Sequence, residues 1–152
     1  MKAEIYTAEI KKLCKDTFDP NGNLSIERIS KMNGVLKKFK KLEIDLKHLK
    51  NEFGNDLYNV SGVKSEKICA KDVCFVIEQY LSNQISMSTL LDWVNTIWFT
   101  ELYVYSAAEE NTIASVMTIL ETIDEDGVLI SKDYFAHMLE CLKGNIPYEK
   151  NY

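Results

Sequence analysis

Residues 85–105, ISMSTLLDWVNTIWFTELYVY, contain both tryptophans of this 152-residue chain and its densest run of large apolar side chains. The apolar residues recur at helical spacing, which predicts one long core helix from Ser86, the expected N-cap, to Tyr105. Two acidic residues and an asparagine interrupt the run, and such side chains are costly in the middle of a bilayer. The stretch therefore favours a core helix over a membrane span, with a buried face that includes Leu90, Val94, Ile97 and Trp98.

The composition favours helices throughout the chain. It contains only 6 glycines and 2 prolines, while 46% of its residues are hydrophobic and 27% are charged, an ordinary globular balance. We predict an all-α protein, a helical bundle of five or six helices without a β-sheet. Because the chain begins without an apolar run of signal-peptide length, we expect a cytoplasmic protein.

Apolar periodicity indicates where the helices lie: about 2–15, 25–53, 65–81, 86–105, 111–123 and 131–144. The second of these carries a nearly heptad apolar stripe from Ile29 to Phe53, with lysines on its other faces. A lysine-rich face is more typical of a solvated helix than of a nucleic-acid surface. We expect residues 1–64 to form an N-terminal helical extension that ends in a linker, and residues 65–152 to form an acidic four-helix bundle.

The two halves differ in charge. Residues 1–67 carry 14 Lys+Arg against 10 Asp+Glu, a net charge of +4, whereas residues 68–152 carry 4 against 13, a net charge of −9. An acidic surface with few lysines repels nucleic acid and attracts a basic protein. The expected partner is therefore a protein with a basic surface, and neither nucleic acid nor a membrane.

Two segments resemble calcium-binding loops. Thr122–Asp133 places Asp124, Asp126 and Asp133 at ligand positions, but its first position is a threonine. A similar pattern at residues 17–28 ends in Arg28, where a bidentate acid belongs. Since connections between helices use Asp, Asn and Gly in any case, we expect both turns to be free of metal.

Other catalytic and metal-binding patterns are weak. Cys69, Cys74, His137 and Cys141 could form a zinc site, but buried, reduced thiols are the plainer interpretation, for Cys14 as well. The chain has two histidines, no nucleophile motif and no phosphate-binding glycine loop. We therefore predict that the protein is not an enzyme and needs no cofactor.

Residues 72–143 resemble the helical bacterial toxin-immunity proteins, the colicin-D-immunity-like proteins and their relatives from contact-dependent inhibition. The resemblance lies in IEQYLSNQISMSTLLDWV at residues 77–94, followed by the acidic turn DEDG at 124–127 and a last helix that ends in LKG at 144. It implies a helical bundle that binds and neutralises one cognate toxin, a nuclease, by covering its basic active-site surface. The expected partner-binding residues are carboxylates off the apolar stripes: Asp92, Glu101, Glu109, Glu110, Glu121, Asp124, Glu125 and Asp126.

Two other functions fit the same sequence. One is a phage or mobile-element inhibitor that blocks a nucleic-acid-binding enzyme with the same acidic surface. The other is a helical scaffold or adaptor that self-associates through the stripe from Ile29 to Phe53.

Overall fold

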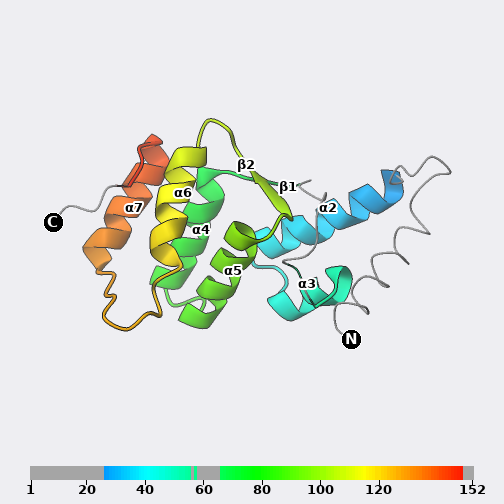
Figure 1. Ribbon diagram of the computed structural model, residues 1–152, viewed down its shortest axis with the longest axis horizontal. Helices are drawn as coiled ribbons and strands as arrows, with labels where there is room; N and C mark the ends of the chain where they lie inside the picture. The colour runs from blue at the N-terminus through cyan, green and yellow to red at the C-terminus, as the bar shows by residue number, and fades with distance from the viewer. Residues whose placement is uncertain (1–25, 56, 58–65, 149–152) are drawn as a thin grey trace. The chain divides into compact units, whose positions relative to one another are not determined.

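The computed structural model of the protein describes residues 26–55, 57 and 66–148. The helix expected at 2–15, most of the loop at 17–28 and most of the linker at 54–64 lie outside this part. The described residues form six α-helices and two short strands, which confirms the predicted all-α bundle. In chain order (Figure 1) these are α2 Ile26–Lys40, α3 Leu46–Phe53, β1 Glu66–Ile68, α4 Ala70–Leu81, α5 Met87–Phe99, β2 Tyr103–Tyr105, α6 Glu110–Leu120 and α7 Lys132–Gly144.

The chain divides into two compact units. Unit 1 consists of residues 1–66 and 99–103, and unit 2 of residues 67–98 and 104–152. Unit 1 therefore contains α2 and α3, and unit 2 contains α4, α6, α7 and nearly all of α5.

The single long helix predicted for residues 25–53 is wrong. The chain turns at Leu42, which adopts a left-handed backbone conformation with φ of 63°, and α3 begins after Asp45. The Asp45 carboxylate accepts a 2.8 Å hydrogen bond from the backbone N–H of His48, as an N-cap does. This break divides the apolar stripe between two packed helices, whose residues Leu36, Phe39, Leu49 and Phe53 are all buried.

In unit 2, α4, α6 and α7 run side by side (Figure 1). The last helix begins and ends where the sequence predicts. The Ser131 hydroxyl accepts a hydrogen bond from the Tyr134 N–H, and Asn145 ends α7 in a left-handed conformation with φ of 54°. At the start of α4, the Asp72 carboxylate accepts a 2.8 Å hydrogen bond from the N–H of Cys69.

The predicted central helix is too long. It begins after Ser86 as expected, since the Ser86 hydroxyl accepts a hydrogen bond from the Thr89 N–H, but it ends at Phe99. Residues 103–105 instead form β2, which pairs with β1 in a two-stranded parallel sheet. The expectation that the protein has no sheet is therefore wrong at two short segments, and the helix expected from residue 65 begins at Ala70. The sequence YVY is rich in aromatic and β-branched side chains, which favour strands.

The two tryptophans of α5 differ in burial. Leu90, Val94 and Ile97 are buried as predicted, but Trp93 (1% exposed) is the buried tryptophan. Trp98 is only half-buried, and its ring contacts Tyr105 edge-on at a centroid distance of 5.7 Å. The assignment of Trp98 to the buried face is therefore corrected to Trp93.

Candidate protein-binding surface

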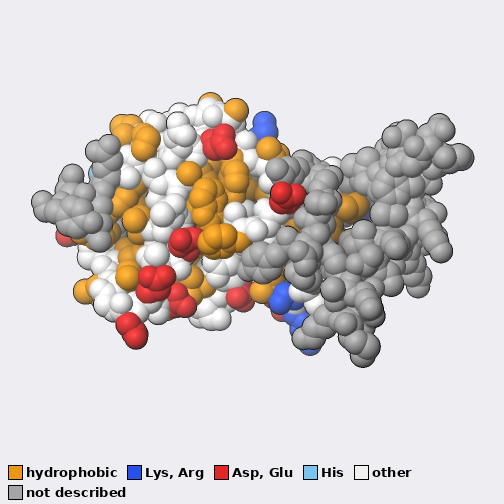
Figure 2. Space-filling view, viewed as in Figure 1, with side chains coloured by type: hydrophobic (Ala, Val, Ile, Leu, Met, Phe, Trp, Pro, Cys, Tyr) orange, Lys and Arg blue, Asp and Glu red, His pale blue; other side chains and the backbone are white. Residues whose placement is uncertain are grey.

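Unit 2 is strongly acidic. Its described residues, 67–98 and 104–148, carry 4 Lys+Arg against 11 Asp+Glu, a net charge of −7. Figure 2 shows acidic side chains, in red, among apolar ones toward the lower left, where Figure 1 draws the connection between α6 and α7. This charge imbalance makes the surface of unit 2 attractive to a cationic partner.

The expected partner-binding carboxylates have different surroundings. Six are exposed and two are half-buried, Glu109 and Glu121. Asp124, Glu125 and Asp126 lie together in the connection between α6 and α7. The other three exposed carboxylates are spread over separate segments: Asp92 in α5, Glu101 just before β2, and Glu110 in the first turn of α6.

Glu109 has a structural contact that the sequence does not reveal. Its carboxylate accepts a 3.1 Å hydrogen bond from the backbone N–H of Ala70, the first residue of α4. It therefore satisfies one of the free N–H groups at that helix start. The Glu110 side chain is exposed and makes no hydrogen bond or ion pair among the described residues, so these neighbouring carboxylates have different surroundings.

Glu121 is the other half-buried member of the set. It lies at the C-cap position of α6, and its Oε2 atom is buried without a hydrogen-bond partner in the described part of the chain. Only part of this carboxylate therefore faces the solvent.

A hollow of about 250 Å³ opens beside the connection between α6 and α7. Two consecutive turns shape this connection: the Glu125 N–H donates to the Thr122 carbonyl at 2.9 Å, and the Val128 N–H donates to the Glu125 carbonyl at 3.1 Å. Leu129 is 86% exposed although it is a large apolar residue. The lining residues are Ile119, Thr122, Gly127, Val128, Leu129, Ile130, Tyr134 and Tyr148.

Aromatic rings contact one another next to this hollow. Tyr134 and Tyr148 meet edge-on with ring centroids 6.3 Å apart. The ring centroids of His137 and Tyr148 are 4.9 Å apart. Burial raises the pKa of Tyr148 above its ordinary value. The buried Tyr148 ring contributes mainly apolar surface to the hollow.

The described cysteines have free thiols, and Cys74 and Cys141 are buried. Burial is the main cause that raises the pKa of both thiols. The Cys141 sulfur lies 3.6 Å from Nε2 of His137. Within the described residues, no group of three His, Cys, Asp or Glu side chains is arranged to hold a metal ion, and Cys14 lies outside them.

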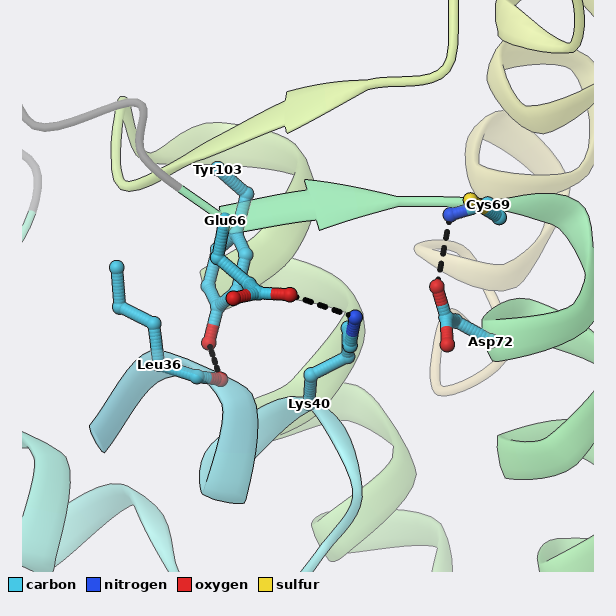
Figure 3. A network of polar contacts seen from close by, with 6 residues as sticks. All are labelled: Leu36, Lys40, Glu66, Cys69, Asp72 and Tyr103. Atoms are coloured by element: carbon cyan, nitrogen blue, oxygen red, sulfur yellow. Dashed lines mark hydrogen bonds and ion pairs between the residues drawn. The ribbon is translucent and has the colours of Figure 1, made fainter. Parts of the chain in front are cut away.

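A polar network in unit 1 was not expected from the sequence. Lys40, which belongs to the lysine-rich stretch expected to be solvated, is buried, and its Nζ lies 2.9 Å from Oε1 of Glu66. Nearby, the Tyr103 hydroxyl donates a 2.7 Å hydrogen bond to the Leu36 carbonyl (Figure 3). Burial, and secondarily the Glu66 charge, raise the pKa of Tyr103 far above its ordinary value. These contacts join residues 66 and 103 to α2, which indicates a structural role.

Comparisons of the chain with protein-family models, with curated proteins and with solved structures find no match. Across the described part of the chain, every helix is too short or too polar to cross a membrane.

Proposed function

We propose that this chain is an immunity-type protein that binds and neutralises a cognate bacterial toxin, a nuclease, by covering its basic active-site surface. The observation that carries the proposal is the group of exposed carboxylates on unit 2, above all Asp124, Glu125 and Asp126. None of these three forms an ion pair among the described residues, so their charges are directed to the solvent.

The physical basis is charge complementarity. A nuclease surface that binds nucleic acid is positively charged, because it must neutralise phosphates. An acidic protein surface is attracted to the same groups and competes for them. Charge attraction acts mainly on the association rate, so binding should slow as added salt shortens the Debye length below about 8 Å.

Two further features support the proposal. The exposed Leu129 and the adjacent hollow offer an apolar contact within the acidic region, and protein interfaces generally combine a few such anchors with a charged rim. The resemblance of residues 72–143 to toxin-immunity proteins implies the same kind of function. The scaffold alternative has less support, because its apolar stripe is divided between two helices with buried side chains.

The test begins with the gene next to the one for this chain. Its product is co-purified with the full chain, and the association rate is measured by surface plasmon resonance over a range of salt concentrations. A toxin gene directly upstream favours immunity, whereas a phage operon favours the inhibitor alternative. Direct binding of the purified chain to single-stranded or duplex nucleic acid would contradict the proposal.

A matched pair of variants then tests where the attraction comes from. The first variant combines Asp124→Asn, Glu125→Gln and Asp126→Asn. We expect it to slow association about tenfold at low salt, because steering by surface charge is worth at least that much. The control variant removes three exposed carboxylates that lie outside the connection between α6 and α7, with Glu43→Gln, Glu78→Gln and Glu140→Gln.

Both variants have the same net charge, so an effect of overall charge would slow them equally. Screening confines strong attraction to charges within about a Debye length of the partner, so the control should change the rate much less. Equal slowing by the two variants would contradict the assignment of the surface.

A further inference from the structure

The hollow beside the connection between α6 and α7 has the size of a site for one side chain. Its volume of about 250 Å³ lies below the roughly 300–1,000 Å³ typical of sites for drug-sized ligands. Most of its lining is apolar or aromatic, from Ile119, Leu129, Ile130 and Tyr134 among others. Its occupant must therefore be small and must present apolar surface.

The charge next to the hollow restricts the occupant further. Along the chain, Asp124, Glu125 and Asp126 fall between two residues that line the hollow, Thr122 and Gly127. All three are exposed. Lys132 and Asp133, which lie between the lining residues Ile130 and Tyr134, are also exposed, and their opposite charges balance each other. The residues beside the hollow therefore keep the three negative charges of residues 124–126. The occupant must therefore be cationic at one end and apolar along its length.

An arginine side chain combines these properties. Its aliphatic stem is favourable against apolar surface, while its guanidinium group stacks on aromatic rings and donates paired hydrogen bonds to carboxylates. Lysine offers only a compact and strongly hydrated charge, which fits the tyrosine-lined hollow less well. Arginine is also enriched among the residues that anchor protein interfaces.

We propose that this hollow binds one arginine side chain of the basic partner, with the stem inside and the guanidinium group at the carboxylates of residues 124–126. The proposal rests on the proposed function and adds the anchor by which the partner is held. It commits to a protein side chain as the occupant.

A titration that needs no toxin tests the proposal. The full chain, labelled with ¹³C at its Ile, Leu and Val methyl groups, is titrated with the peptide acetyl-Gly-Arg-Gly-amide and followed by NMR. We expect saturable shifts at Ile119, Val128, Leu129 and Ile130. The same peptide with citrulline keeps the shape of arginine but lacks its charge. It should bind about three- to tenfold more weakly, because charge-assisted hydrogen bonds to exposed carboxylates are lost.

Three outcomes would overturn the assignment: no shifts, shifts at another surface, or equal binding of the two peptides. Residues 149–152 of the chain are a competing occupant. If deleting these residues shifts the same methyl signals while the arginine peptide does not shift them, residues 149–152 would be the occupant of the hollow.

Two variants refine the test. Val128→Phe places a ring in the hollow and should abolish the shifts. Asp124→Asn with Asp126→Asn should weaken arginine binding about three- to tenfold and keeps the test valid if Val128→Phe does not fold. The control, Glu43→Gln with Glu140→Gln, removes two exposed carboxylates outside the connection and should bind the peptide like the unaltered chain.

The same variants separate this inference from the proposed function. A toxin that binds Val128→Phe as tightly as the unaltered chain would overturn the arginine anchor and leave the proposed function standing. An arginine peptide that binds in the hollow, while no adjacent gene product is captured, would contradict the proposed function alone.

Discussion

The two units differ in the balance of their charges and in the burial of their ion pairs. The described residues of unit 1 carry 8 Lys+Arg against 6 Asp+Glu, and its Lys40–Glu66 ion pair is largely buried, with side chains 10% and 13% exposed. The described residues of unit 2 carry 4 against 11, and most of these carboxylates are exposed. Its Lys143–Glu78 pair, at 3.6 Å, is also exposed to solvent. Unit 1 thus contains a largely buried ion pair, whereas the carboxylates of unit 2 are mostly exposed, apart from a few such as Asp72 and Glu109, which accept hydrogen bonds at the start of α4.

The largest expected effect concerns apolar burial in unit 2. Trp93→Ala should cost about 3–5 kcal/mol of unfolding free energy, because it removes a fully buried aromatic side chain and leaves a cavity. Trp98→Ala should cost less, since that side chain is only partly buried. Urea unfolding of the two variants, followed by circular dichroism, measures both values. Equal losses would contradict the burial of α5 described above.

The next effect tests the comparison of charges directly. Glu66→Gln should cost about 2–3 kcal/mol, because it removes the negative charge next to the buried Lys40 ammonium group. Asp124→Asn should change stability by less than about 0.5 kcal/mol, because that carboxylate is exposed. Both values come from urea unfolding at neutral pH. The contrast between the units would be contradicted if Asp124→Asn lowered the unfolding free energy while Glu66→Gln left it unchanged.

Alkaline pH should weaken both units by the same mechanism. Burial raises the pKa of Tyr103 in unit 1 and of Tyr105 in unit 2, whose hydroxyls donate to the carbonyls of Leu36 and Ile97. Above pH about 10 the unfolded chain loses these protons while the folded chain keeps them. The resulting stability is therefore complete below pH about 10 and falls above it, by up to about 1.4 kcal/mol per pH unit for each tyrosine.

The measurement is urea unfolding at several pH values from 8 to about 11. Tyr103→Phe and Tyr105→Phe should each make the unfolding free energy fall less steeply with rising pH. Each should first lower that free energy by about 0.5–1.5 kcal/mol, because one hydrogen bond is removed. An unchanged slope in both variants would contradict the assignment to these tyrosines.

The smallest expected effect separates two neighbouring carboxylates of unit 2. Glu109→Ala should cost about 1 kcal/mol, because Ala70 at the start of α4 loses its hydrogen-bond acceptor. Glu110→Ala should cost at most about 0.5 kcal/mol, since this side chain is exposed. In thermal unfolding a loss of 1 kcal/mol corresponds to a fall in Tm of about 2–4 °C for a chain of this size. If Glu110→Ala lowers the Tm more than Glu109→Ala does, Glu110 and not Glu109 would be the carboxylate that stabilises the fold.

The surface proposed for the partner could be predicted only in part. The sequence identifies the acidic half and the run at residues 124–126, because charge counts and turn residues are local properties. It does not identify Glu109 as a cap, since its acceptor contact is with Ala70, 39 residues away. It also does not identify the hollow, whose lining combines residues from α6, α7, their connection and Tyr148.

The sequence by itself determined the helical class, the start of α5 at Ser86 and the start of α7 at Ser131. Composition, apolar periodicity and capping residues act within a few residues of one another, so they can be recognised without the fold. Tertiary structure decided the break at Leu42, the strand at residues 103–105 and the choice of Trp93 over Trp98 as the buried ring. Each of these depends on which distant segment covers an apolar surface or pairs with a backbone edge, because such contacts outweigh local preferences of a fraction of a kcal/mol per residue.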